Sequence, residues 1–201
     1  MSRAREPMPP PDLEGYTYVD LLGSGGFSDV FLYERDFPRQ KVAIKVLVAE
    51  ALGDTGADRF SAEANVMASL STHPYIVTIY EARVAPTGHP YLVMEYYPRP
   101  NMHVRARSER LPVDVVLRVG IQVASAVESA HRIGVLHRDI KPANILTSAY
   151  GRPGLTDFGI AAAEGEHVVE AEGMSIPWAS PEIVTWSRPP DSRVHNVAPR
   201  E

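Results

Sequence analysis

The sequence contains no cysteine and no long apolar run. Without cysteine the chain forms no disulfide and no thiolate metal site, which fits a reducing cytoplasm, the location that we expect. No run of about 18 apolar residues occurs, so we expect no membrane-spanning segment. Positive charge is also in short supply, because 20 Lys and Arg face 25 Asp and Glu, and the net charge of −5 argues against nucleic acid as a partner.

The composition is that of one globular domain. The chain has 201 residues, of which 44% are hydrophobic and 22% are charged, and this is enough for a sizeable core. Residues 1–14 are polar and rich in proline, and we expect them to form a disordered tail.

A glycine-rich stretch follows the first predicted strand, which spans residues 16–22. It reads Gly-Ser-Gly-Gly-Phe-Ser-Asp-Val over residues 23–30, and glycines let backbone N–H groups approach phosphate oxygens. A Rossmann fingerprint would continue into a helix, and a Walker A loop would end in Gly-Lys-Ser/Thr. Here the apolar, β-prone residues 30–33 follow instead, which favours a second strand.

Two charged residues interrupt the apolar patterns of the next two segments. Residues 41–48 alternate as a strand, and Lys45 lies on one of its apolar faces. Residues 58–70 have helical periodicity, and Glu63 lies on the apolar side of that helix. Lys45 either reaches solvent at a sheet edge or meets an anion, and Glu63 pairs either with Arg59 or with a more distant cation.

The segments that follow contain two further strands and a long helix. The strands are predicted over residues 76–83 and 91–96. Residues 98–110 are basic, and we expect an irregular stretch there. Apolar residues at steps of three and four predict a helix over residues 112–133, with proline in its first turn and glycine just past its end.

The clearest chemistry lies in residues 137–144, which read His-Arg-Asp-Ile-Lys-Pro-Ala-Asn. Asp-Phe-Gly follows at residues 157–159. Together these motifs place a carboxylate, an ammonium, an amide and a second carboxylate in a short length of chain. Such a set can position a hydroxyl, neutralise a phosphate and hold Mg²⁺.

The spacing His-Arg-Asp-x-x-x-x-Asn matches the catalytic loop of protein kinases, and Asp-Phe-Gly matches their metal motif. On these motifs the chain resembles the bacterial eukaryotic-type (Hanks-type) protein serine/threonine kinases. The resemblance implies an α+β, two-lobed protein-kinase-like fold. Its N-lobe, residues 15–97, would hold a five-stranded antiparallel sheet and one helix. Its C-lobe, residues 98–186, would be mainly helical and incomplete.

The resemblance also implies a role for each motif residue. Lys45, which ends Val-Ala-Ile-Lys, would bind phosphate and pair with Glu63. Asp139 would accept or orient the proton of the substrate hydroxyl, and Lys141 would neutralise the transferring phosphate. The implied metal ligands are Asn144 and Asp157. The implied nucleotide site comprises Leu22, Gly23, Ser24, Gly25, Gly26, Val30, Ala43, Lys45, Met94, Glu95, Tyr97 and Asn144.

The implied activity is transfer of the γ-phosphate of ATP, with Mg²⁺, to Ser or Thr hydroxyls of proteins, the kinase itself included. One alternative is an ATP-binding fragment without catalysis, because residues 187–201 are polar and proline-rich where the family has further helices. We expect an irregular tail there. A second alternative, a small-molecule kinase of the aminoglycoside phosphotransferase type, is disfavoured by Lys141 and by Ser180-Pro181-Glu182, which stands for Ala-Pro-Glu.

Residues 160–178 correspond to the activation segment of such kinases. Residues 160–174 contain no Ser, Thr or Tyr, and their acidic residues are Glu164, Glu166, Glu170 and Glu172. One hypothesis is that one of these carboxylates replaces an activating phosphate and pairs with Arg138. The alternative is an acidic, flexible loop.

Overall fold

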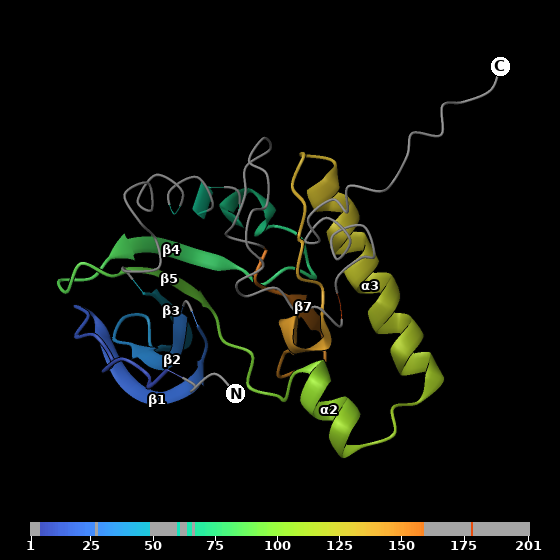
Figure 1. Ribbon diagram of the computed structural model, residues 1–201, viewed down its shortest axis with the longest axis horizontal. Coiled ribbons are helices and arrows are strands. Elements are labelled where there is room, and N and C mark those ends of the chain that lie inside the picture. Colours follow the sequence, from blue (N-terminus) through green and yellow to red (C-terminus); the bar gives the residue numbers. More distant parts are fainter. Residues whose placement is uncertain are drawn as a thin grey trace, which may run out of the picture.

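The computed structural model describes residues 5–26, 28–48, 60, 64–65, 67–158 and 178. In this part of the chain a five-stranded sheet comes first and two helices with a small second sheet follow (Figure 1). The expected order of a sheet lobe and a mainly helical lobe is therefore confirmed.

The five strands of the large sheet pair in an antiparallel manner throughout, as predicted. Their order across the sheet is β1-β2-β3-β5-β4. The strands are β1 (Tyr16–Ser24), β2 (Ser28–Arg35), β3 (Gln40–Leu47), β4 (Ile79–Val84) and β5 (Pro90–Glu95). Neighbours β1, β2 and β3 are joined by short turns, because each is separated from the next by only a few residues rich in glycine or proline.

Alternation along β3 divides the core into two hydrophobic clusters. Val42, Ile44 and Val46 are fully buried and belong to a cluster formed within the N-lobe. Ala43 and Leu47, on the other face, belong to a cluster that also includes residues of the C-lobe. The period of two in the sequence therefore predicts both faces of this strand correctly.

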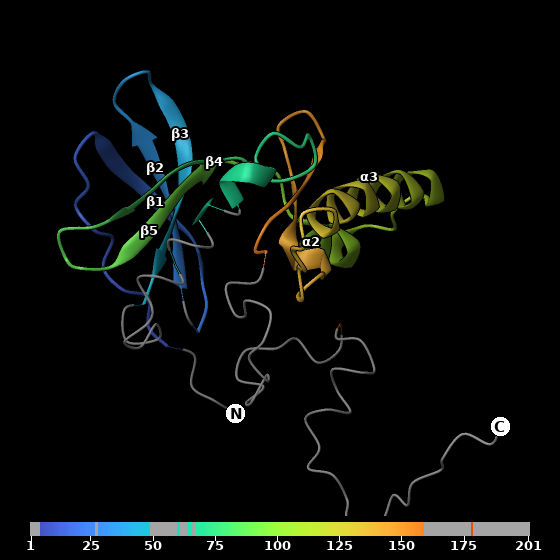
Figure 2. The same ribbon diagram turned by 90° about the horizontal axis from the view of Figure 1, so that it is seen from above.

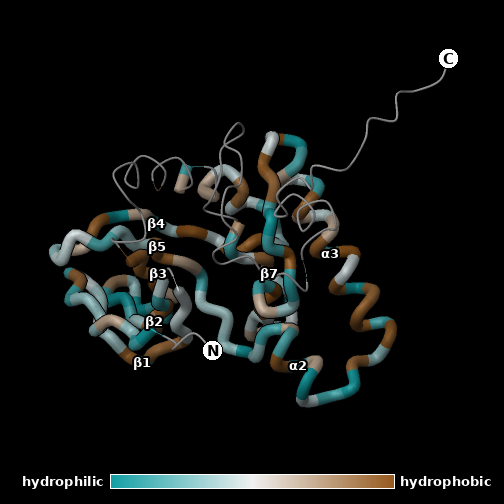
Figure 3. The backbone as a smooth tube through the Cα atoms, in the orientation of Figure 1, coloured by the Kyte–Doolittle hydropathy of each residue, from teal (hydrophilic) through white to brown (hydrophobic). Residues whose placement is uncertain are grey.

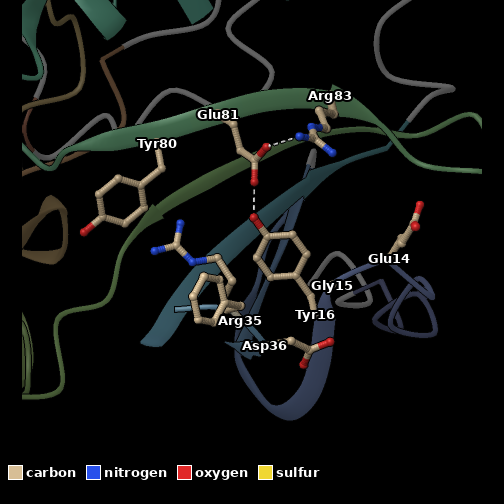
Figure 4. Close-up of a pocket in the computed structure, with 9 residues that line it drawn as sticks. Glu14, Gly15, Tyr16, Arg35, Asp36, Tyr80, Glu81 and Arg83 are labelled. Atoms are coloured by element: carbon tan, nitrogen blue, oxygen red, sulfur yellow. Dashed lines mark hydrogen bonds and ion pairs between the residues drawn. The ribbon is translucent and has the colours of Figure 1, made fainter. Parts of the chain in front are cut away.

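The sheet curls so that its two edge strands meet at one end. The hydroxyl of Tyr16, at the start of β1, donates to the carboxylate of Glu81 in β4 (Figure 4). Burial, the hydrogen bond and the charge of Glu81 together raise the pKa of Tyr16 to about 12, so the hydroxyl keeps its proton at neutral pH. This contact closes the sheet around the N-lobe cluster.

The prediction of a disordered tail over residues 1–14 is wrong for residues 5–14, which contact the sheet. Leu13 is 3% exposed, and Met8 packs against the N-lobe cluster. The Tyr33 hydroxyl donates to the Pro11 carbonyl at 2.6 Å. Apolar Met8 and Leu13 supply the burial that the polar, proline-rich composition concealed, and prolines favour the extended chain that lies along the strands.

The C-lobe begins with a helix that the sequence did not predict. Helix α2 (Met102–Ser108) lies within the segment expected to be irregular. The Asn101 side chain caps it by accepting a hydrogen bond from the Val104 N–H at 3.0 Å. Met102 is its buried residue, whereas Arg105 is partly exposed and pairs with Glu109, and so the basic composition hid a short surface helix.

Helix α3 (Val113–His131) confirms the long predicted helix. Its C-terminal half is packed, because Val123, Ala126 and Ala130 are buried. Toward its N-terminal end the apolar residues are not covered, since Val116 is 50% exposed. In Figures 2 and 3 the helix extends away from the sheet, and hydrophobic residues lie along its whole length.

A small hairpin, β6 (Ile145–Thr147) with β7 (Pro153–Leu155), lies between the large sheet and α3 (Figures 1 and 2). It is joined to the segment before β4, because Val77 N–H donates to the Leu155 carbonyl at 2.9 Å and Leu155 N–H donates to the Tyr75 carbonyl at 2.8 Å. These two hydrogen bonds fix the hairpin of the C-lobe against the chain of the N-lobe. All the described residues of the predicted helix over residues 58–70, namely 60, 64–65 and 67–70, are helical.

Candidate active site

The loop over residues 137–144 begins soon after helix α3 ends. Gly134 has φ +77°, a conformation that glycine adopts readily and that turns the chain out of the helix. The loop closes with a 3₁₀ turn, η2 (Pro142–Asn144), in which the Asn144 N–H donates to the Lys141 carbonyl at 3.0 Å. Proline suits the first position because it has no N–H to satisfy. The turn directs Asn144 back toward Asp139.

Asp139, Lys141 and Asn144 are in direct contact. The Lys141 Nζ lies 2.6 Å from Asp139 Oδ2. The Asn144 Nδ2 donates to the same oxygen at 3.1 Å and to the Asp139 carbonyl at 2.9 Å. The Asp139 side chain is 29% exposed, so the carboxylate is fixed in orientation yet reachable from solvent. A carboxylate in this setting can accept a proton from a hydroxyl.

His137 packs against the loop from the protein interior. Its side chain is 2% exposed and its ring lies 4.6 Å, centroid to centroid, from that of Phe158, so the two rings pack together in the interior. Nε2 lies 2.9 Å from the Thr156 carbonyl, and Nδ1 accepts the Asp139 N–H at 3.3 Å. These partners require a neutral ring with its proton on Nε2. Burial, opposed by Thr156 and the nearby acids, lowers the pKa of His137 and keeps the ring neutral.

Lys45 and Asp157 form an ion pair between the lobes. The Lys45 Nζ lies 2.7 Å from Asp157 Oδ1, and Lys45 is 8% exposed. Burial disfavours the charged form of Asp157, but the charge and hydrogen bond of Lys45 outweigh it and lower the pKa of the carboxyl. The choice that the sequence left open for Lys45 is therefore decided, because this lysine meets an anion.

Backbone strain lies on both sides of the site. Arg138 has φ +62° and Asp157 has φ +59°, in the left-handed region that residues other than glycine rarely adopt. Such a conformation costs about 1–3 kcal/mol per residue and is found mostly at functional sites. The surrounding contacts of His137 and Lys45 hold both residues in place.

The predicted nucleotide residues line one side of the sheet. Val30, Ala43, Met94 and Tyr97 pack in the cluster that joins the two lobes. Ala43 lies opposite Met94, and Lys45 opposite Val30, in the strand register. The turn of the glycine loop is closed by a hydrogen bond from the Gly25 N–H to the Ser28 carbonyl at 2.9 Å. The remaining loop residues, Leu22, Gly23, Ser24 and Gly26, are exposed.

Several predicted features lie outside the described residues. These are Glu63, and with it the predicted Lys45–Glu63 pair, the acidic residues 164–172, Ser180-Pro181-Glu182 and the tail over residues 187–201. Their roles remain predictions.

The donor set fits a hard divalent cation. Asn144 uses its amide nitrogen to bind Asp139, which leaves the amide oxygen as the ligand atom. Asp157 contributes a carboxylate that its lowered pKa keeps ionised. Thr156 N–H donates to the Asn144 carbonyl at 3.0 Å, so the two predicted ligand residues lie on adjoining segments. Amide and carboxylate oxygens are the ligands that Mg²⁺ prefers.

Sequence reasoning missed a polar network beside the site. Arg152, in the turn between β6 and β7, binds both carboxylate oxygens of Glu95 at 2.9 and 3.2 Å. Glu95 also accepts from the Thr78 hydroxyl at 3.3 Å. The Tyr97 ring lies against Gly154, where any Cβ would come within 2.5 Å of the hydroxyl oxygen. No local pattern marks Arg152, because its partners are far away in the sequence.

A pocket of about 470 Å³ lies at the end of β1 opposite the glycine loop (Figure 4). None of the predicted site residues lines it. Two of its charged residues pair with each other, because Arg83 Nη2 lies 2.7 Å from Glu81 Oε2. It is therefore not the candidate active site.

Comparison with known proteins agrees with this geometry. The protein kinase domain model matches residues 16–195. The serine/threonine-protein kinase PknK of Mycobacterium tuberculosis is 37% identical over 188 residues, covering 91% of this chain and 17% of PknK. The serine/threonine-protein kinase drp72 of Corynebacterium efficiens is 33% identical over 190 residues, covering 92% of this chain and 35% of drp72.

Among solved structures, the M. tuberculosis PknI kinase domain is similar with a TM-score of 0.62 and 35% identity, covering 74% of this chain and 60% of that domain. The chain spans only a minor part of the length of PknK and of drp72. None of the helices in the described part of the chain has the length and apolarity that crossing a bilayer requires.

Proposed function

This chain belongs to the protein kinase domain family, and from that premise we propose that it transfers the γ-phosphate of ATP to Ser or Thr hydroxyls of protein substrates. The observation that carries the proposal is the contact of Asp139 with both Lys141 and Asn144. It brings a proton acceptor, a cation and a predicted metal ligand together within one short loop. Phosphoryl transfer needs little more than such positioning and charge neutralisation.

Asp139 is the group that orients the substrate hydroxyl and accepts its proton. Its Oδ2 is engaged by Lys141 and Asn144, so the carboxylate keeps one orientation while the substrate binds. Lys141, beside it, places positive charge where the transferring phosphate gains negative charge. A cation in that position is worth more to the transition state than to the ground state.

Lys45 and the pair Asn144 and Asp157 hold the nucleotide phosphates and their metal. When bound, Mg²⁺ supplies the charge that neutralises the phosphate oxygens. Lys45 is buried and already paired with Asp157, so its ammonium is held at a defined position on the sheet. We infer that ATP and Mg²⁺ are required together, and that the enzyme acts in the cytoplasm, where ATP is available.

The proposal is tested with the purified chain, Mg-ATP and labelled phosphate. We expect label on the chain itself or on a generic protein acceptor, recovered as phosphoserine or phosphothreonine, and none on small alcohols. Asp139→Asn should lower transfer by about 10²–10⁴-fold, the usual effect of removing a general base. The matched control is Asp114→Asn, which alters an exposed carboxylate on α3.

Nucleotide binding separates the proposal from its alternative. Asp139→Asn should retain the rise in melting temperature that Mg-ATP causes in the unaltered chain. A chain that binds Mg-ATP but transfers no phosphate to any acceptor is an ATP-binding fragment without catalysis, and that result would overturn the proposed activity.

A further inference from the structure

A fully buried carboxylate lies at the start of β2, next to the glycine loop. Asp29 follows the loop in β2 and is 0% exposed. Asp29 lies on the same face of the strand as Phe31 and Tyr33, because side chains two residues apart share a face. This face is opposite to that of Val30. A buried ion is costly unless it is paired and hydrogen-bonded. Asp29 is therefore a site where specific partners are needed.

Two of its partners come from the N-terminal segment. The Arg5 Nη2 lies 2.7 Å from Asp29 Oδ1, and the Met8 N–H donates to Oδ2 at 2.9 Å. Burial disfavours ionisation of Asp29, but the hydrogen bonds from Arg5, Ser24 and Met8 outweigh it and lower the pKa of the carboxyl. Each oxygen of this carboxylate is thus satisfied by a residue far away in the sequence.

Arg5 also contacts the glycine loop itself. Its Nη2 donates to the Gly25 carbonyl at 3.3 Å. In a trans peptide the C=O and the following N–H point in opposite directions. A Gly25 carbonyl held by Arg5 therefore directs the Gly26 N–H away from Arg5. Lys45 lies on that other side, since it opposes Val30 in the register.

The segment is anchored along its length and not by Arg5 alone. The Tyr33 hydroxyl binds the Pro11 carbonyl at 2.6 Å, Met8 packs on the N-lobe cluster, and Leu13 is buried. Residues 5–13 can therefore hold the guanidinium at a fixed place. We refer to these residues as the N-terminal brace.

We propose that the N-terminal brace orients the glycine loop for phosphate binding, with Arg5 as a positioning residue. Arg5 acts through Asp29 and the Gly25 carbonyl and does not touch the nucleotide. Because its charge is matched by that of Asp29, its contribution is orientation of loop N–H groups and not attraction of phosphate. This inference rests on the proposed function, since it assumes that the loop receives the phosphates of ATP.

The decisive variant is Arg5→Met, which keeps the length of the side chain and removes its donors. With calorimetry we expect about a fivefold loss of Mg-ATP affinity, the size of one lost hydrogen bond, and no change for adenosine, which lacks phosphates. In phosphate transfer the KM for ATP should rise while kcat is unchanged. Arg39→Met removes an exposed ion pair with Glu34 on the same sheet and should change neither.

A double-mutant cycle tests whether Arg5 acts through its partner. Asp29→Asn should weaken Mg-ATP as Arg5→Met does, and the double variant should be no weaker than either single variant. Equal loss of ATP and adenosine affinity would overturn the proposal, because it would indicate general damage to the lobe. Unchanged ATP affinity in Arg5→Met would also overturn it.

Hydrogen exchange separates this inference from the proposed function. The amides of residues 24–30 should exchange faster in Arg5→Met than in the unaltered chain, even with no nucleotide present. If the unaltered chain binds no nucleotide, the proposed function fails, and the exchange result still decides whether the brace holds the loop. Unchanged exchange in these residues would rule the brace out.

Discussion

The guanidinium of Arg152 binds both carboxylate oxygens of Glu95, at 2.9 and 3.2 Å, and so joins the β6–β7 turn to the end of β5. The same side chain donates to the Pro74 carbonyl and lies 5.7 Å from the centre of the Tyr97 ring. Three segments that surround the connection between the lobes therefore meet at one residue.

We predict that Arg152→Ala lowers the free energy of unfolding by about 1–2 kcal/mol, because Glu95 would keep its charge without its cation. Chemical denaturation measures this directly. The matched control is Arg132→Ala, which removes an equally short but exposed pair with Glu128 on α3. That change should cost less than about 0.5 kcal/mol, and equal costs for both variants would contradict the importance of the Arg152 contact.

Gly154 is required for packing and not for a special backbone conformation. A Cβ there would lie 2.5 Å from the Tyr97 hydroxyl oxygen and 2.6 Å from the ring. Gly154→Ala should therefore destabilise the protein by about 1–3 kcal/mol, as overpacking does. In the double variant with Tyr97→Leu the effect of the added methyl should largely disappear.

The comparison for that experiment is Gly120→Ala. Gly120 lies in α3, where a Cβ meets nothing within 4 Å. Alanine is the better helix former, so this variant should gain up to about 1 kcal/mol. The same substitution thus has opposite signs at the two positions, and melting temperatures that move in the same direction would refute this account.

His137 makes stability depend on pH near neutrality. Its folded pKa is below the ordinary value of 6.5, so below that pH the unfolded chain binds a proton that the folded chain does not. Stability should therefore fall as the pH drops through about 6.5. Asp157, whose pKa is also lowered, contributes stability at neutral pH that is lost only as the pH falls below its ordinary value of 3.8.

Melting temperatures from about pH 8 to about pH 5 test this prediction. His137→Gln should make the profile less steep, because glutamine keeps an N–H donor for Thr156 but does not titrate. His73, whose pKa burial also lowers, keeps its part of the dependence. His103→Gln, at an exposed position on α2, should leave the profile unchanged. An undiminished pH dependence in His137→Gln would show that other groups cause it.

The sequence predicted the sheet and singled out the loop over residues 137–144, because both depend on local pattern. Alternation in β3 gave the two faces and the position of Lys45. The motif around Asp139 gave the loop, since its spacing places Lys141 and Asn144 on one turn. Helix α2 was missed because its surface is basic and its single buried residue, Met102, produces no periodic signal.

The N-terminal brace shows a signal that was present but not used. Asp29 interrupts the apolar face of β2 just as Lys45 interrupts that of β3, and the same argument would have demanded a cation for it. What no sequence pattern supplies is the identity of that cation, because Arg5 and Asp29 meet only once the chain has folded back on itself. The pairing of Arg152 with Glu95 was hidden for the same reason.

Because the core is divided into two clusters, the molecule should unfold in two steps. One cluster is made by the N-lobe and the N-terminal brace, around Val42, Ile44 and Val46, whereas the other needs residues from both lobes. Thermal opening of the contact between the lobes removes only the shared cluster. The curled sheet should therefore persist as a separate cooperative unit, with the amides of β3 exchanging last.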